Sequence, residues 1–358
     1  MKITTVKTLR LAFDLQRLDA PEAQKALDRA AGIVRAGGLV AFPTETVYGL
    51  GANALDRAAV AQIFAAKQRP SWDPVIVHIA GPVEANPMIE LLVTSIPEEA
   101  RKLMVAFWPG PLTLLLPRSA AVPDSVTANR PLVGIRMPAH PVALELIRRA
   151  QVPIAAPSAN TFSRTSPTTA DHVLEDLVGR IDAILDGGPA PQGVESTVLD
   201  PCQSPMVIYR PGAITAEQIR RAAGEVELFR PGRHPAGEPH ALPAPGVGLR
   251  HYAPRARLIL VDAPAAKLPA ELAALAALHG RERVGIMLPA GLEIPDAPGA
   301  TIFPWGRWSV PEEMARDLYA GLRRLDAQGC TIVLCPVPPH QGIGVAIRDR
   351  LRKAARKA

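Results

Sequence analysis

Short apolar runs alternate with amphipathic stretches along most of the chain. Four mainly apolar runs are typical of buried strands: residues 39–42, 112–116, 132–137 and 152–156. Apolar positions recur at helical spacing in five other stretches: residues 21–36, 57–66, 97–107, 141–149 and 170–178. Further strands are expected near residues 183, 197 and 207. This alternation predicts an α/β domain with a twisted, mixed sheet.

The pattern changes at residue 229. Residues 231–254 contain six prolines and four glycines, without the period of a helix or strand. Apolar runs and helical stretches then alternate again. We therefore expect a first domain over residues 1–229, a linker over 230–254, and a smaller Rossmann-like, doubly wound domain over 255–358. The linker carries His251 and Tyr252, and both an inert spacer and a lid over a site stay open.

The positive charge is concentrated at one end of the chain. The formal net charge is +6, and residues 342–358 hold six Lys or Arg against one Asp. Ile343, Ile347 and Leu351 form an apolar line through this segment. The pattern favours a docked terminal helix with a solvated basic back, and an RNA contact is the alternative.

Other features of the composition exclude several classes of protein. No apolar run reaches the roughly 18 residues of a membrane span, and charges interrupt residues 1–28. We expect a soluble, cytoplasmic protein without a signal peptide. Cys202, Cys330 and Cys335 lie in or beside apolar runs and are expected to be core thiols. No spacing of His, Cys, Asp or Glu indicates a metal cluster.

Polar groups follow several of the predicted strands. Pro43 ends the first run, so the Thr-Glu-Thr segment at 44–46 lies at a strand end, where open α/β sheets bind ligands. Gly49 and Gly51 are expected to allow a sharp turn or a close approach to a ligand. Lys67 and Arg69 follow a helix for which Asp56 is the expected N-cap. Taken alone, these two cations fit either a solvated pair or an anion site.

Arg136 stands in an apolar run, where an uncompensated charge is costly. It must pair with a protein carboxylate or bind a substrate carboxylate. Similar polar groups follow later strands, at 158–160, Ser196 and Arg210. Together these strand ends predict an anion-binding cleft.

These residues resemble a known family. Pro-Thr-Glu-Thr-Val-Tyr-Gly-Leu-Gly at 43–51, Lys-Gln-Arg-Pro at 67–70, His78, Ser-Ala-Asn at 158–160 and Ser-Thr at 196–197 are similar to the YrdC-type threonylcarbamoyl-AMP synthases. Pro-Gly at 245–246 and His-Tyr-Ala-Pro at 251–254, followed by an α/β domain, resemble the long, two-domain form of that family.

The resemblance implies a nucleotidyltransferase that makes L-threonylcarbamoyl-AMP and pyrophosphate from L-threonine, bicarbonate or CO₂, and ATP. It implies Mg²⁺ bound through ATP and not by protein side chains alone. It further implies that the product passes to a separate tRNA threonylcarbamoyl transferase, which modifies the adenosine next to the anticodon. The first domain would be YrdC-like and catalytic, and the linker would be an active-site lid.

The resemblance also implies site residues. The L-threonine positions are Thr46, His78, Arg136, Ala156 and Ser196. The ATP positions are Arg69, Asp73, Leu132, Ser158, Asn160, Ser166, Arg210, His251 and Tyr252. Lys67 and Arg69 would be the catalytic cations, which stabilise charge developing at phosphorus. Positioning and charge stabilisation would then supply catalysis without a protein nucleophile.

Two other functions fit the same fold. A non-catalytic module could bind double-stranded RNA or tRNA, but such modules usually spread cations over a face. The terminal helix leaves open only a weak tRNA contact. A carbamoyl-phosphate-handling domain, as in hydrogenase maturation proteins, predicts accessory zinc-finger and acylphosphatase-like regions, for which this sequence shows no pattern.

Overall fold

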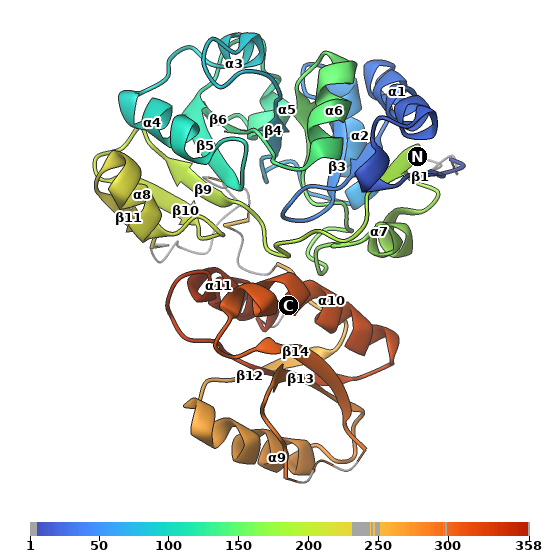
Figure 1. Ribbon diagram of the computed structural model, residues 1–358, viewed down its shortest axis with the longest axis vertical. Helices are drawn as coiled ribbons and strands as arrows, with labels where there is room; N and C mark the ends of the chain where they lie inside the picture. The colour runs from blue at the N-terminus through green and yellow to red at the C-terminus, as the bar shows by residue number, and fades with distance from the viewer. Residues whose placement is uncertain are drawn as a thin grey trace. The chain divides into compact units, whose positions relative to one another are not determined.

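The computed structural model describes residues 6–230, 244, 246–247, 251–295, 297 and 299–356 (Figure 1). The chain divides into two compact units. The first takes residues up to 162, then 167–190 and 195–248, and the second takes 163–166, 191–194 and 249 onward. Most of the predicted linker lies outside the described residues, so its action as a lid stays a prediction.

The first unit is built on one eleven-stranded sheet of order β1-β8-β2-β3-β7-β4-β6-β5-β9-β10-β11. Its strands are β1 (Leu9–Ala12), β2 (Val40–Phe42), β3 (Gly49–Asn53), β4 (Ile76–His78), β5 (Leu112–Pro117), β6 (Leu132–Arg136), β7 (Ile154–Ala155), β8 (Ala183–Asp186), β9 (Thr197–Asp200), β10 (Met206–Arg210) and β11 (Val226–Leu228). Strand β2 pairs antiparallel with β3 and parallel with β8, so the sheet is mixed, as predicted.

The helices of this unit begin and end at ordinary sequence signals. They are η1 (Leu15–Arg17), α1 (Pro21–Arg35), α2 (Arg57–Lys67), α3 (Pro87–Leu92), α4 (Glu98–Phe107), α5 (Asp124–Thr127), α6 (Pro141–Ala150), α7 (Ala170–Leu177) and α8 (Ala216–Ala223). Asp56 caps α2 as expected, because its Oδ1 accepts from the amides of Ala58 at 2.8 Å and Ala59 at 3.2 Å. Gln68 ends α2 in the left-handed conformation, with a φ of 54°.

Alternate side chains of the sheet enter different core clusters, as the period of a strand requires. Val40 and Phe42 pack in the cluster that α1 and α6 supply with Leu27, Val34 and Leu146. The neighbouring position, Ala41, packs in the larger cluster together with residues of α2 and α4.

The second unit has a four-stranded sheet of order β12-β15-β13-β14, with every neighbouring pair parallel. Its elements are β12 (Arg257–Val261), η2 (Ala265–Lys267), α9 (Leu268–Leu278), β13 (Val284–Ala290), β14 (Thr301–Arg307), α10 (Pro311–Ala327), β15 (Ile332–Pro336) and α11 (Gly344–Ala354). Helix α9 covers one face and α10 and α11 the other (Figure 1). This arrangement confirms the predicted Rossmann-like, doubly wound sheet.

The structure corrects three expectations. Gly49 and Gly51 do not form a turn but lie in β3, where a Cβ on Gly51 would come within 2.7 Å of the Phe42 ring. Cys202 is exposed, because it follows β9 in a surface turn, and only Cys330 and Cys335 are core thiols. Arg350 is 1% exposed and is not part of a solvated basic back.

Candidate functional site

Predicted site residues share one face of the central strands. His78 and Arg136 are register partners on β4 and β6. Further along this face lies an apolar cluster that includes Ile76 and Val198, with Leu132 packed against it. Ala244 is fully buried in the same cluster. Leu132 therefore supplies apolar packing to this face and no polar side chain.

Arg136 is buried, and all its described partners belong to the protein. Its Nη1 donates to Oγ1 of Thr46 at 2.9 Å, and its Nε donates to the Gly110 carbonyl at 3.2 Å. Nη2 lies 2.7 Å from Oε1 of Glu45. A protein carboxylate is thus a partner of Arg136, and its binding of a substrate carboxylate stays a prediction. Thr44 supports the turn, since its Oγ1 donates to the Val47 carbonyl at 2.6 Å.

His78 is a buried, neutral imidazole. Burial, and then the positive charge of Arg136, lower its pKa to about 3. Its ring meets that of Phe42 edge to face, with the centroids 6.0 Å apart. The backbone amide of Ala156 donates to the Ile76 carbonyl at 2.8 Å and brings the end of β7 beside β4.

Ser196 is held by a set of polar groups just before β9. Its Oγ and Oγ1 of Thr113 share a hydrogen bond of 2.8 Å. Arg210 donates to the Ser196 carbonyl and to its Oγ, both at 3.0 Å. A Cβ on Gly212 would lie 2.3 Å from the Thr197 amide nitrogen, so only glycine permits this backbone approach.

Lys67 and Arg69 are not a solvated pair, since they are 1% and 8% exposed. Nζ of Lys67 donates to the carbonyls of Ser158, at 2.6 Å, and Asn160. Burial, with a smaller contribution from Arg69, lowers the pKa of Lys67 well below its usual value. These contacts bring the 67–69 and 158–160 segments together.

Asp73 is the ion-pair partner of Arg69. Nη2 of Arg69 lies 3.0 Å from Oδ2 of Asp73 and donates to the Pro74 carbonyl at 2.7 Å. Burial raises the pKa of Asp73, and the charge of Arg69 opposes that rise. Oδ1 of Asp73 has no hydrogen-bond partner among the described residues.

Three predicted ATP residues belong to the second unit. Ser166 is one of them, and its side chain is fully buried in the chain. The ring of Tyr252 stacks on that of Tyr319 at a centroid distance of 5.8 Å, and the Arg350 guanidinium lies 5.2 Å from its centre. The His251 ring lies 4.3 Å from that of Tyr252. Their approach to a nucleotide stays a prediction.

The sequence analysis missed Glu45, Thr113 and Gly110 as contacts of site residues. Glu45 was placed at a strand end without a role, and Thr113 is a polar residue within an apolar run. Gly110 contributes only its carbonyl, which no side-chain pattern can reveal.

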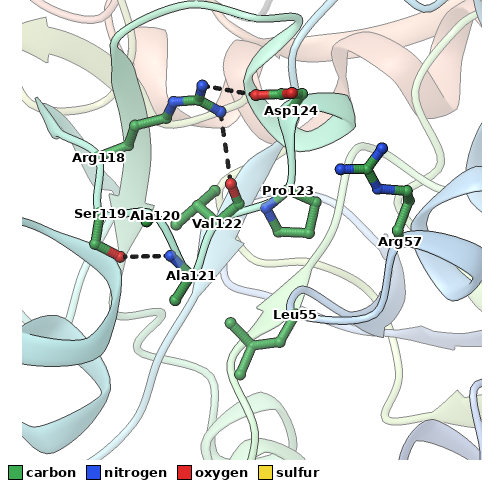
Figure 2. A pocket seen from close by; sticks show the side chains of 9 residues that line it. All are labelled: Leu55, Arg57, Arg118, Ser119, Ala120, Ala121, Val122, Pro123 and Asp124. Carbon is green, nitrogen blue, oxygen red and sulfur yellow. Dashed lines mark hydrogen bonds and ion pairs between the residues drawn. The ribbon is translucent and has the colours of Figure 1, made fainter.

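A surface pocket of about 610 Å³ lies near the start of α2 and contains no predicted site residue. Figure 2 shows Arg118 directed at Asp124, with which it forms an ion pair of 2.6 Å. Arg57 begins α2 and Lys67 ends it, roughly 15 Å apart at 1.5 Å per residue. The pocket is therefore separate from the candidate site.

Within the described part of the chain, no group of three or more His, Cys, Asp or Glu side chains could hold a metal ion. Asp73 offers one buried carboxylate oxygen, which fits Mg²⁺ carried mainly by phosphate oxygens. None of the described helices has the length and apolar character that crossing a membrane requires.

Comparison with known proteins places this geometry in a family. Residues 32–212 match the family model described as telomere recombination, and residues 214–356 match that of the threonylcarbamoyl-AMP synthase C-terminal domain. The threonylcarbamoyl-AMP synthase of Pyrococcus abyssi is 44% identical over 91% of this chain and 93% of its own length. That of Bacillus subtilis is 42% identical over 98% of both. The chain belongs to the threonylcarbamoyl-AMP synthase family.

This membership confirms the resemblance and the expectation of an enzyme, since the relatives are named as synthases. The fold of this chain agrees with that of a solved threonylcarbamoyl-AMP synthase relative over nearly the whole length of both chains. A crystal structure of P. abyssi Sua5 complexed with L-threonine superposes with a TM-score of 0.87 and 42% identity, over 97% of this chain and 98% of that one.

Proposed function

We propose that this chain makes L-threonylcarbamoyl-AMP and pyrophosphate from L-threonine, bicarbonate or CO₂, and ATP. The burial of the Lys67 amine without an anionic partner among the described residues is the observation that carries the proposal. Its described partners are carbonyl oxygens, and it forms no ion pair among the described residues. A buried cation of this kind is costly unless an anion arrives. ATP and bicarbonate supply such anions.

L-threonine would bind on the face shared by β4 and β6. Arg136 would bind its carboxylate, and Thr46, Ser196 and the neutral His78 offer hydrogen bonds to its other polar groups. The backbone of Ala156 would complete the site. The named L-threonine complex of the P. abyssi relative supports this assignment.

ATP would bind near the 67–73 and 158–160 segments. Arg69, Asp73, Ser158, Asn160 and Arg210 supply polar groups there, and Leu132 supplies packing. Ser166 would also contact ATP, and His251 and Tyr252 would close over the nucleotide as parts of the predicted 230–254 lid. Mg²⁺ would accompany the triphosphate and neutralise part of its charge.

The reaction needs positioning more than a protein nucleophile. The free amine of threonine and bicarbonate give a carbamate and water, and a carbamate oxygen then attacks the α-phosphorus. The bond from that phosphorus to the bridging oxygen breaks, and pyrophosphate leaves. Lys67 and Arg69 would stabilise the charge at phosphorus, each contact contributing about 1.5–3 kcal/mol.

The product would serve a separate tRNA threonylcarbamoyl transferase in the cytoplasm. A non-catalytic double-stranded RNA or tRNA-binding role is the alternative. The described basic helix α11 argues against it, because Arg350 is buried and Arg348 pairs with Asp262 at 2.5 Å.

Pyrophosphate release tests the proposal. The purified chain with ATP, Mg²⁺ and bicarbonate should release pyrophosphate with L-threonine and much less with L-serine or L-alanine. Arg136→Ala should mainly raise the threonine requirement, and Lys67→Ala should mainly lower turnover. Release that ignores both threonine and bicarbonate would overturn the proposed function.

A further inference from the structure

Glu45 is a buried carboxylate whose hydrogen-bonding capacity is unused. The residue is 5% exposed. Its Oε1 lies 2.7 Å from Nη2 of Arg136, but the pair lacks hydrogen-bond geometry. Neither Oε1 nor Oε2 has a hydrogen-bond donor among the described residues. Buried polar atoms are nearly always paired, so these oxygens are suited to a donor from a ligand.

Nearby titratable groups do not neutralise Glu45 in place of Arg136. His140 lies close enough for the charge of Glu45 to act on it, but burial lowers the pKa of His140 and favours its neutral form. Its Nδ1 accepts from the Val142 amide at 3.3 Å. His78 is neutral as well. Arg136 is the cation that pairs with Glu45 in the described structure.

Glu45 and Arg136 therefore present a carboxylate and a guanidinium cation side by side within the candidate site. Thr46 joins them, because its Oγ1 accepts from Arg136 and it follows Glu45 in the chain. An α-amino acid carries the complementary pair of charges, a carboxylate and an ammonium on one carbon. A simple carboxylate would satisfy Arg136 but would leave Glu45 beside a second negative charge.

We propose that Glu45 binds the amino group of the substrate and makes the site selective for amino acids over hydroxy acids. The inference rests on the proposed function. Oε2 accepts an N–H of the ammonium and, after that group has given a proton to bulk water and become a nucleophilic amine, an N–H of the amine. Arg136 is shared between Glu45 and the substrate carboxylate. Glu45 is thus a specificity-determining residue.

Calorimetric binding to the full chain tests this assignment with two ligands, L-threonine and 3-hydroxybutanoate, which is threonine without its amino group. The wild-type chain should bind L-threonine at least about tenfold more tightly. Glu45→Gln should lower the affinity for L-threonine by about 10- to 100-fold. It should leave the affinity for 3-hydroxybutanoate unchanged or raise it, because Arg136 is then freer to bind a carboxylate. Glu22→Gln, on the exposed side of α1, is the matched control.

Equal losses of affinity for both ligands in Glu45→Gln would overturn the assignment. They would show that Glu45 only holds Arg136 in position. If that variant does not fold, the wild-type comparison decides, since equal affinities for the two ligands would also overturn it. A wild-type chain that neither binds L-threonine nor releases pyrophosphate would instead refute the proposed function.

Discussion

Nζ of Lys67 lies 2.6 Å from the carbonyl oxygen of Ser158, within a buried environment that lowers the pKa of the lysine. A carbonyl oxygen attracts the ammonium group less than a carboxylate would. The charged form of Lys67 is therefore poorly compensated until an anion binds. Binding of an anionic ligand should therefore favour the protonated form of Lys67.

We expect ATP binding to be accompanied by proton uptake at Lys67, because the triphosphate favours the charged lysine. ATP affinity should fall as the pH rises from the lowered pKa of Lys67 toward 10.5. Titration calorimetry in buffers of different ionisation enthalpy measures the protons taken up. Lys67→Met should abolish the uptake and exposed Lys102→Met should keep it. Identical uptake in all three proteins would contradict this prediction.

Stability should depend on pH through His78. Its pKa is about 3 in the folded chain and 6.5 ordinarily, so the unfolded chain binds the extra proton between these values. Stability is fully present above pH 6.5 and is lost as the pH falls toward 3. From about pH 7.5 to about pH 5, His78 should account for a loss of about 2 kcal/mol.

Denaturant unfolding at the two pH values checks the contribution of His78. His78→Gln should be less sensitive to acid than the wild type by that amount, whereas exposed His340→Gln should behave as the wild type does. A His78→Gln chain with the full acid sensitivity would show that other groups cause it.

Gly212→Ala should displace Ser196. The added Cβ would lie 2.3 Å from the Thr197 nitrogen, and backbone atoms cannot yield as a flexible side chain does. We expect a loss of about 1–3 kcal/mol in unfolding free energy and weaker L-threonine binding. Gly32→Ala is the control, since a Cβ added there would lie 3.9 Å from its closest contact, in the Arg35 side chain. Because alanine favours a helix over glycine, this change in α1 should raise the unfolding free energy by up to about 1 kcal/mol. Unchanged stability and binding in Gly212→Ala would count against the close approach.

Tyr252→Ala should loosen the second unit locally. It removes the stack on Tyr319 and the contact with Arg350, an aromatic truncation that costs about 3–5 kcal/mol when buried. Amide hydrogen exchange should accelerate in α10 and α11. Tyr252→Phe keeps the ring and should preserve slow exchange. Unaltered exchange in Tyr252→Ala would show that the stack does not stabilise these helices.

The sequence predicted the elements whose pattern is local. Helix α6 spans residues 141–150, where an apolar helical period predicted 141–149, and α2 begins after Asp56. Strands β1, β3, β11 and β14 were not predicted. Gly49 and Gly51 hid β3, because glycine rarely marks a strand and these two serve the packing of Phe42.

The candidate site was predictable only in part. The ends of several strands carried polar groups, and the structure brings Thr46, His78 and Arg136 together. The partner of Arg136 was not predictable, because Glu45 is 91 positions away and only the folded sheet joins them. The burial of Lys67 depends likewise on its contact with the carbonyl of Ser158.

Strand β1 at the sheet edge pairs with β8, so during synthesis Leu9 cannot form its strand pair until Ala183 has been made. At about 5–20 residues per second, the ribosome needs roughly 10–35 s to make the intervening chain. β2 also pairs with β8, at Val40 and Ala183, and shares this delay. A nascent chain that has not yet reached residue 186 therefore exposes β1 and β2 without their parallel partner β8. The time for which these two strand edges stay unpaired depends on the rate of translation.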